Sequence, residues 1–322
     1  MKLFRMIAQT RSMPFSDSTT EVAARFHLIA RWAAGRAAAA IHILCPSVWN
    51  EGIGVLMYHR VTERVSGVAP PTCNVTPTSL HHQLSGLLAR GFQPWPLSKL
   101  VQCSERGEAV PSKTFAVTFD DGYENNFLNA LPILHELKTP ATIFLPTAFL
   151  DTTSPFPFDT WKAAGSSEVP VSAWRPLSTG QCHELLESGL IEFGAHTHSH
   201  QDFVGRCDDF CRDVEICLQT LQRRFGIERP TFAFPYGFYS NELVNAATKL
   251  GVSRCFSTKC EPVRAAKPSL LWGRFGVQAS DTDAVLAAKL SGSYTRVLKS
   301  GKALTRPVKS LVGNVRPGRQ DW

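Results

Sequence analysis

The sequence has no apolar run long enough to cross a membrane. The small and aliphatic residues at 38–44 form a run far shorter than the about 20 residues that a spanning helix needs. The run also lies farther from Met1 than the apolar region of a signal peptide, so we expect neither a span nor a cleaved signal. The segment from Glu21 to Ile43 fits an amphipathic helix, lying either on the folded domain or on a membrane.

A regular cysteine framework is also missing. The nine cysteines are odd in number and unevenly spaced, which excludes a small secreted disulfide scaffold and favours the cytoplasm or the cytoplasmic face of a membrane. Cys207, Cys211 and Cys217 fall on one expected helix. A metal or redox pair is one interpretation of the first two, and small buried thiols on an apolar helix face are the preferred one.

The positive charge is concentrated at the two ends of the chain. Residues 1–50 carry a net +4 and residues 296–322 a net +6, and since the whole chain is +7, the remaining residues carry −3. A mildly acidic body gives no reason to expect nucleic-acid binding. The basic ends are either solvated or in peripheral contact with an anionic membrane or polymer.

An apolar segment at 115–119 ends abruptly in Asp120, Asp121 and Gly122. Five apolar or β-branched residues between Pro111 and this acidic pair predict a strand buried on both faces, as in a parallel sheet. Because the chain turns at the glycine, both carboxylates can reach one cavity beyond the strand's carboxyl end. Taken alone, an Asp-Asp-Gly turn is more often a helix cap.

Two further expected strands end in residues suited to chemistry. The segment 190–195 precedes His196 and His200, whose spacing would place two imidazoles on one side of a helical turn and lets them share a metal ion. The segment 231–234 precedes Pro235, Tyr236 and Gly237, a turn that can aim a backbone N–H into the same cavity. Strands and helices alternate along the chain, which favours a parallel barrel over a sandwich.

These stretches together resemble the polysaccharide deacetylase family, also called carbohydrate esterase family 4 with its NodB homology domain. The similarity rests on Thr118-Phe119-Asp120-Asp121-Gly122, His196-Thr197-x-x-His200, Phe232-Ala233-Phe234-Pro235-Tyr236-Gly237, Val55-Leu56-Met57-Tyr58-His59-Arg60-Val61 and Pro140-Ala141-Thr142-Ile143-Phe144, and covers about residues 51–280. It implies an α/β fold, a deformed (β/α) barrel with about seven strands. We therefore expect a basic N-terminal extension over 1–50, a catalytic barrel over 51–290 and a loosely ordered basic tail over 291–322.

The resemblance also implies roles for individual residues. Asp121, His196 and His200 would bind a divalent metal ion, and the two imidazoles favour Zn²⁺ over Mg²⁺. Asp120 would take the proton from the attacking water, and the backbone N–H of Tyr236 would stabilise the oxyanion. The substrate would be an N-acetylated glycan.

Two departures from the family pattern bear on this mechanism. Ala233 stands where the family usually has an arginine that orients the catalytic aspartate, and no histidine follows His200 to serve as the general acid. His59, at the end of the first expected strand, is our candidate for the acid, with a histidine hydrogen-bonded within the rim as the alternative.

The stretch between Pro146 and Arg175 is rich in proline and aromatic residues. A long insertion of this kind is usually functional or mobile, and aromatic faces at a barrel rim can stack on sugar rings. Trp161 and Trp174 within it, and Tyr123 beside the acidic turn, are the candidate substrate-binding residues. The alternative is that these aromatics anchor the loop to the barrel.

Three functions are consistent with these residues. The first is metal-dependent removal of N-acetyl groups from a polysaccharide or oligosaccharide. The second is hydrolysis of a small non-sugar C–N bond on the same barrel. The third is a glycan-binding pseudoenzyme, in which Ala233 and the missing distal histidine mark lost catalysis.

Overall fold

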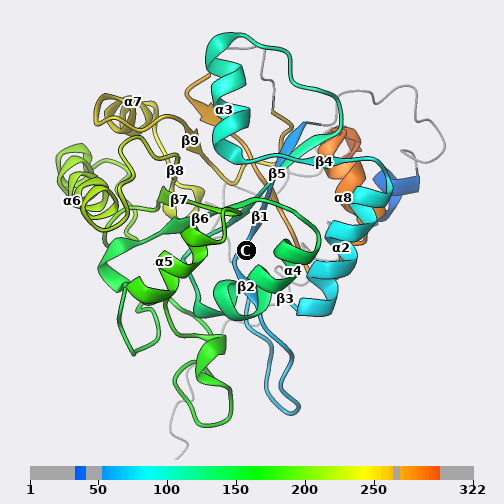
Figure 1. The fold of residues 1–322 in the computed structure, drawn as a ribbon, viewed down its shortest axis with the longest axis horizontal. Coiled ribbons are helices and arrows are strands. Elements are labelled where there is room, and N and C mark those ends of the chain that lie inside the picture. Colours follow the sequence, from blue (N-terminus) through cyan, green and yellow to red (C-terminus); the bar gives the residue numbers. More distant parts are fainter. Residues whose placement is uncertain (1–32, 41–52, 264–268, 298–322) are drawn as a thin grey trace, which may run out of the picture.

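The computed structural model describes residues 33–40, 53–263 and 269–297. Most of the basic N-terminal extension and of the basic tail therefore lies outside the described residues. The described part is a curled parallel sheet with helices packed around it (Figure 1).

The main sheet is built from strands that pair only in parallel. Its order along the sheet is β10-β9-β8-β7-β6-β5-β1-β11, and β4 adds a short pairing on β5. The strands are β1 (Gly54–Tyr58), β4 (Gln93–Pro94), β5 (Thr114–Phe119), β6 (Ala141–Leu145), β7 (Ile191–Ala195), β8 (Phe232–Ala233), β9 (Cys255–Phe256), β10 (Leu271–Trp272) and β11 (Phe275–Gly276). A small second sheet pairs β2 (Arg60–Val61) with β3 (Asn74–Val75).

Helices connect the strands and cover the sheet. Helices α5, α6 and α7 lie on one side of the central strands and α2, α4 and α8 on the other (Figure 1). They are α2 (Pro77–Ala89), α3 (Leu97–Arg106), α4 (Leu131–Glu136), α5 (Thr179–Glu187), α6 (Cys207–Phe225), α7 (Asn241–Lys249) and α8 (Asp283–Leu290). Side-chain caps set several starts: Thr76 accepts from Ser79 N, and Ser178 and Gln181 form a capping box.

The two edges of the sheet are brought together by a connection of two residues. β10 and β11 stand at opposite ends of the strand order, yet only Gly273 and Arg274 separate them in sequence. Three peptide steps span at most about 11 Å, so the sheet must curl until its edges meet. A Cβ on Gly273 would lie 2.1 Å from the Lys259 carbonyl oxygen, so this connection, which we call the seam, requires glycine.

The expected deformed (β/α) barrel is confirmed, with eight strands along the sheet order rather than about seven. Strands β5, β7 and β8 agree with the expected segments 115–119, 190–195 and 231–234 to within one residue at each end. Helices α3 and α8 and the short strands β2, β3, β4, β10 and β11 were not expected. Their apolar patterns are too weak or too short to indicate a helix or a strand from the sequence.

Both proposed domain boundaries stay predictions, although packed structure extends past them. Residues 33–40, within the segment expected to be an amphipathic helix, are helical, and Ala38 and Ala39 are buried in the main core. At the other end, Ser293 and Tyr294 are buried, so the chain stays packed beyond residue 290. In the described residues, no helix is both long and apolar enough to cross a membrane.

Candidate metal centre and active site

The two aspartates that follow β5 enter one cavity. Asp120 and Asp121 are both buried and both line it. The strand ends at Phe119, and Asp121 and Gly122 then adopt left-handed backbone conformations with φ of 72° and 68°. This turn brings two adjacent side chains, which a continuing strand would send to opposite faces, to the same side.

His196 and His200 follow β7 and face Asp121. The expectation that they sit on a helical turn is wrong: residues 196–200 form a loop in which Thr197 and His200 have φ of 63° and 55°. Asp213 of α6 holds the loop, because its carboxylate accepts hydrogen bonds from the backbone N–H groups of His198 and Ser199 and from the Ser199 hydroxyl. His198 itself is turned to Thr147, 3.0 Å away.

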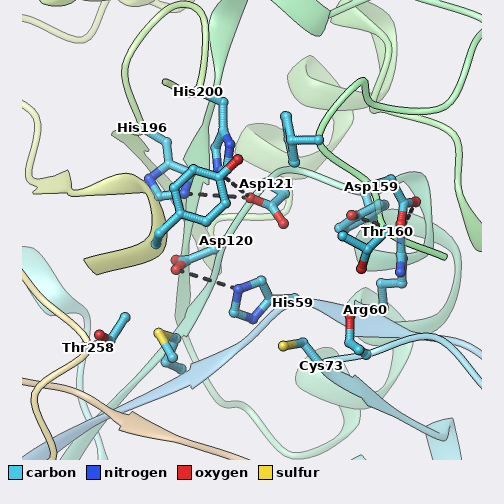
Figure 2. A pocket seen from close by; sticks show the side chains of 15 residues that line it. His59, Arg60, Cys73, Asp120, Asp121, Asp159, Thr160, His196, His200 and Thr258 are labelled. Atoms are coloured by element: carbon cyan, nitrogen blue, oxygen red, sulfur yellow. Dashed lines mark hydrogen bonds and ion pairs between the residues drawn. The ribbon is translucent and has the colours of Figure 1, made fainter. Parts of the chain in front are cut away.

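Asp121, His196 and His200 form a compact set of potential metal ligands. Asp121 Oδ1 lies 3.5 Å from His196 Nε2 and 3.2 Å from His200 Nε2, and one ligand atom from each of the three residues falls within 4.8 Å of the others (Figure 2). His196 Nδ1 is 2.7 Å from the Ala233 carbonyl oxygen, which fixes the ring with Nε2 toward the cavity. Two imidazoles and a carboxylate fit a zinc-type ion, so the residues present suit the expected metal.

The surroundings keep both carboxyl groups ionised. Burial by itself raises the pKa of Asp121, but hydrogen bonds from His196 and His200 hold that pKa well below its ordinary value. Burial likewise raises the pKa of Asp120, but the charge of Arg274 and its hydrogen bonds, together with the nearby His196 and His59, outweigh burial and lower that pKa. For His200, burial lowers the pKa, which favours the neutral, metal-binding imidazole.

Arg274, in the seam, is a site residue that the sequence did not reveal. Its fully buried guanidinium donates to both oxygens of Asp120, with Nη1 2.6 Å from Oδ1 and Nη2 2.8 Å from Oδ2. Nη1 also lies 3.2 Å from Thr118 Oγ1. Such a bidentate pair fixes the orientation of a carboxylate. Arg274 therefore orients Asp120 in place of the family arginine, whose position is taken here by Ala233. The position of Arg274 after a short strand is the only sequence signal that could have indicated this role.

His59 lies at the end of β1 and on the other side of Asp120 from the metal ligands. Its Nε2 is 3.9 Å from Asp120 Oδ2, and its side chain is 19% exposed (Figure 2). This distance is too long for a hydrogen bond and short enough for an ion pair when the imidazole is protonated. The structure thus brings His59 into the cavity.

Tyr236 also belongs to the cavity lining. It follows β8 in the turn Pro235–Gly237, where its φ of 58° is a left-handed conformation. Its ring meets the edge of the His200 ring at 4.8 Å between centroids. The left-handed conformation of Tyr236 turns the backbone sharply beside His200.

The loop at 146–175 closes one side of the cavity, which has a volume of about 120 Å³. Phe158 stacks on His200 with 3.6 Å between ring centroids. Asp159 forms an ion pair with Arg60, and both side chains are buried. Arg60 also donates to the Tyr123 hydroxyl at 2.9 Å and lies over the Tyr123 ring.

Of the three candidate substrate-binding residues, only Tyr123 lines the cavity. Trp174 is buried and Trp161 is partly buried in a small cluster with Ala163 and Val169, inside the loop. Trp161 Nε1 donates to the Ala69 carbonyl oxygen at 2.7 Å. This placement favours the anchoring role for both tryptophans.

The cysteines of α6 take the packing role. Cys217 is buried in the main core, and Cys207 and Cys211 pack against that core. Burial raises the pKa of the Cys217 thiol to about 12, which makes it inert at neutral pH. Among the residues that the structure describes, the Asp121, His196 and His200 set is the single group of three or more suited to a metal ion.

Two histidines and an aspartate at the carboxyl ends of the strands of a parallel barrel form a group that could hold a metal ion. A family model described as polysaccharide deacetylase matches residues 107–255. This stretch of the chain is thus similar to the polysaccharide deacetylase family, in agreement with the motifs.

Curated relatives and solved structures agree with this assignment. The chain is 26% identical over 247 residues to the poly-β-1,6-N-acetyl-D-glucosamine N-deacetylase of Escherichia coli (strain K12), covering 67% of this chain and 35% of that protein. It is 24% identical over 221 residues to the protein of the same name from Staphylococcus epidermidis, covering 63% and 71%. The chain thus spans about a third of the length of the first of these relatives.

Two solved structures share the fold. The structure of IcaB from Ammonifex degensii matches with a TM-score of 0.60 and 23% identity, covering 75% of this chain and 97% of that one. The Streptococcus pyogenes deacetylase PplD, solved in complex with acetate, matches with a TM-score of 0.62 and 20% identity, covering 75% and 99%. At these identities the likeness establishes the fold.

Proposed function

We propose that this protein is a metal-dependent hydrolase that removes N-acetyl groups from an N-acetylated glycan, with β-1,6-linked poly-N-acetylglucosamine as the first candidate. The observation that carries the proposal is the pairing of a buried Asp-His-His set with a second, unligated aspartate held by Arg274. The names of the curated relatives supply the candidate glycan.

The metal would be held by Asp121, His196 and His200, with Zn²⁺ as the best match to those donors. When bound, such an ion acts as a Lewis acid toward a carbonyl oxygen and makes a nucleophilic water available near neutral pH. The other residues of the cavity would orient the substrate and transfer protons.

Asp120 is placed to act as the general base. Arg274 keeps it ionised and fixes the direction of its two oxygens, so it can accept a proton from a water molecule in the cavity. The backbone N–H of Tyr236 would stabilise the oxyanion that forms on the acetamide carbonyl. His59, across Asp120, would then donate a proton to the departing amine nitrogen.

The position of Arg274 bears on the pseudoenzyme alternative. That alternative depended on the missing distal histidine and on Ala233, which leaves the catalytic aspartate without its usual partner. Here a bidentate arginine reaches the same carboxylate from a different strand end. The intact orientation of Asp120 supports an active enzyme over a glycan-binding relative.

Acetate release tests the proposed function directly. We expect the purified protein to release acetate from N-acetylated β-1,6-glucosamine oligomers, to lose this activity with a chelator, and to regain it with added Zn²⁺. The variant Asp121→Ala should be inactive under all these conditions. Oligomer binding without acetate release would support the pseudoenzyme instead, and release only from small non-sugar amides would support the second alternative.

The role of His59 is tested with two leaving groups. His59→Ala should lower the turnover of an N-acetylated oligomer at least tenfold, because an amine leaves poorly without a proton. Turnover of an aryl acetate ester, whose leaving group needs no proton, should change much less. His135→Ala, an exposed histidine on α4, is the matched control. Equal losses on both substrates would exclude His59 as the general acid.

A further inference from the structure

Arg254 is a buried cation at the end of the barrel opposite to the metal cavity. It directly precedes β9 and so lies at the amino-terminal end of that strand, whereas the candidate metal ligands follow the carboxyl ends of theirs. Arg254 is 6% exposed. The next residue, Cys255, donates its backbone N–H to the carbonyl oxygen of Leu270, which is 42% exposed. Arg254 therefore lies close to the surface, next to residues that solvent reaches.

The other buried arginine and lysine side chains of the described residues are each compensated by an aspartate. These ion pairs join Arg60 to Asp159, Arg274 to Asp120 and Lys289 to Asp281. Within the part of the chain that the structure describes, Arg254 forms no ion pair and its guanidinium donates no hydrogen bond to another residue. A buried charge without a partner is costly, so an anion that supplied the missing charge would be bound.

A second donor without a partner lies beside this guanidinium. Arg254 Cζ is over the Trp272 ring, 4.8 Å from the ring centroid. Trp272 is 4% exposed, and its Nε1 is buried with no hydrogen-bond partner, as is Nε of Arg254. Nε is also unpartnered in Arg60 and Arg274, but an aspartate neutralises each of those two side chains. Buried N–H groups in proteins usually have an acceptor, so the adjacent donors of Arg254 and Trp272 indicate one that binds between them.

The acidic charge near Arg254 is already shared with another arginine. Burial lowers the pKa of Arg254, the charge of Glu105 raises that pKa and the charge of Arg229 lowers it. Glu105 accepts hydrogen bonds from both terminal nitrogens of Arg229, at 3.0 and 3.3 Å. Two guanidinium groups thus share one carboxylate, which leaves a surplus of positive charge at this end of the barrel.

We infer that Arg254 and Trp272 form a binding site for a small oxyanion of the phosphate class, separate from the metal centre. A guanidinium can donate to two oxygens of one phosphate, and the indole N–H is a further donor. The guanidinium lies over the ring, whereas the indole N–H lies in the ring plane, so the donors stand at different levels. The oxygens of a tetrahedral phosphate match such an arrangement better than those of a planar carboxylate. This inference does not rest on the proposed function.

Calorimetric titration of the metal-free full chain with phosphate, at constant ionic strength, tests the site. We expect one phosphate to bind per chain with a Kd below about 1 mM. Arg254→Met, which replaces the guanidinium by an apolar side chain, should weaken binding at least about tenfold. Trp272→Phe keeps a ring below the guanidinium but removes the N–H, and should weaken binding about three- to tenfold. Arg106→Met, which removes an exposed arginine of α3, is the control and should bind phosphate like the wild type.

Thermal unfolding gives an independent measurement of the same site. Without phosphate, Arg254→Met should unfold at the temperature of the wild type or above it, because the variant removes an uncompensated buried charge. Phosphate at about ten times its Kd should raise the unfolding temperature of the wild type by about 3 °C and leave that of Arg254→Met nearly unchanged.

Absence of one-to-one binding to the wild type up to about 10 mM phosphate would overturn the inference, because water then satisfies both N–H groups. Equal thermal shifts in wild type and Arg254→Met would also overturn it, since a general salt effect does not depend on one arginine. Acetate that bound as tightly as phosphate would overturn the assignment to the phosphate class.

A further variant covers the case in which Arg254→Met does not fold. Arg254→Lys keeps the charge but loses the planar fork, so phosphate should bind about tenfold more weakly, and unchanged binding would contradict the site. None of these titrations involves a glycan or a metal ion. Their outcome is therefore distinguishable from success or failure of the acetate-release experiment.

Discussion

Arg274 orients Asp120, the role that the family pattern gives to an arginine at the position of Ala233. The two positions, 233 and 274, are far apart in the sequence. The guanidinium enters from the seam between β10 and β11, 154 positions after the aspartate that it orients. The guanidinium carbon also lies over the Phe144 ring of β6, 5.2 Å from the ring centroid. Arg274 is therefore held by packing against an aromatic ring as well as by its ion pair. A buried charge pair of this kind is costly to break and less costly to remove as a whole.

We therefore expect Arg274→Met to destabilise the protein by about 3–5 kcal/mol, since the variant leaves an uncompensated carboxylate inside the barrel. The double variant Arg274→Met with Asp120→Asn should recover a large part of this loss, because neither charge remains. Urea unfolding of the metal-free proteins in the presence of a chelator measures both. Equal destabilisation of the single and double variants would show that packing of the arginine, not its charge, is what matters.

At the scale of elements, the loop between β7 and α6 positions the two imidazoles. Asp213, in the second turn of α6, fixes residues 198 and 199 through their backbone N–H groups, and the histidines flank them. Partners behind metal ligands commonly change metal affinity 10- to 100-fold when they are removed. The helix thus helps to position the candidate metal ligands, although it supplies none of them.

Asp213→Ala should weaken Zn²⁺ binding about 10- to 100-fold, measured by competition with a chromophoric chelator. Asp208→Ala, which removes an exposed acid in the first turn of the same helix, should bind Zn²⁺ like the wild type. A thermal unfolding measurement without metal separates loss of the loop from loss of the fold. Unchanged affinity in Asp213→Ala would mean that β7 and the left-handed residues alone hold the histidines.

The seam can be tested in the same way. Gly273→Ala should lower the thermal unfolding temperature and kcat together, because an added Cβ would meet the Lys259 backbone at 2.1 Å and displace the neighbouring Arg274. Gly205→Ala, at a glycine whose added Cβ would meet no atom within 4 Å but whose φ is 81°, is the control for a purely local backbone cost. If both variants lost stability but kept kcat, the seam would not position the arginine.

At the scale of the whole molecule, Asp151 ties the long loop to two helices. Its carboxylate accepts from the backbone N–H and hydroxyl of Thr179 at 2.6 and 2.7 Å, and from Arg224 of α6 at 2.9 Å. Burial raises its pKa, but these hydrogen bonds and the arginine charge together outweigh burial and bring the pKa below its ordinary value of 3.8. A carboxyl group whose pKa is lowered on folding stabilises the protein at pH values where it is ionised in both states.

This stabilisation should be fully present above about pH 5 and should disappear as the pH falls below 3.8 toward the lowered pKa. Asp151→Asn keeps the left-handed backbone accessible and removes the charge. The difference in free energy of unfolding between wild type and this variant should be constant from pH 5 to 7 and shrink below pH 3.8, measured by urea unfolding. A difference that does not change with pH would show that the charge contributes nothing.

The parts of the molecule that sequence predicted well are those whose signal is local. Buried parallel strands such as β5 are continuous apolar runs, and the charged residues at their ends must meet because all strand ends share one face of the barrel. The parallel sheet and the meeting of Asp121 with the two histidines followed from this, and the resemblance to the family supplied the deformed barrel and the metal. The loop conformation at 196–200 did not, because the same spacing of two histidines is produced by a helical turn or by left-handed residues.

Arg274 was missed for a different physical reason. Its partner is brought near by closure of the whole sheet, and strands of two residues carry no periodicity from which that closure can be read. The tryptophans of the long loop illustrate the remaining ambiguity. A stretch rich in aromatic residues looks the same in sequence whether its side chains pack in the core or bind a ligand. Only the burial of each side chain in the structure distinguishes these two roles.

The seam has one further consequence, for how the protein can be dissected. The stretch matched by the family model, residues 107–255, contains all three metal ligands and Asp120, but His59 precedes it and Arg274 follows it. An excised fragment with those limits would keep these four side chains but lose strand β1, which pairs with β5, and the two partners that flank Asp120. The smallest autonomous unit must therefore begin before β1 and extend past β11.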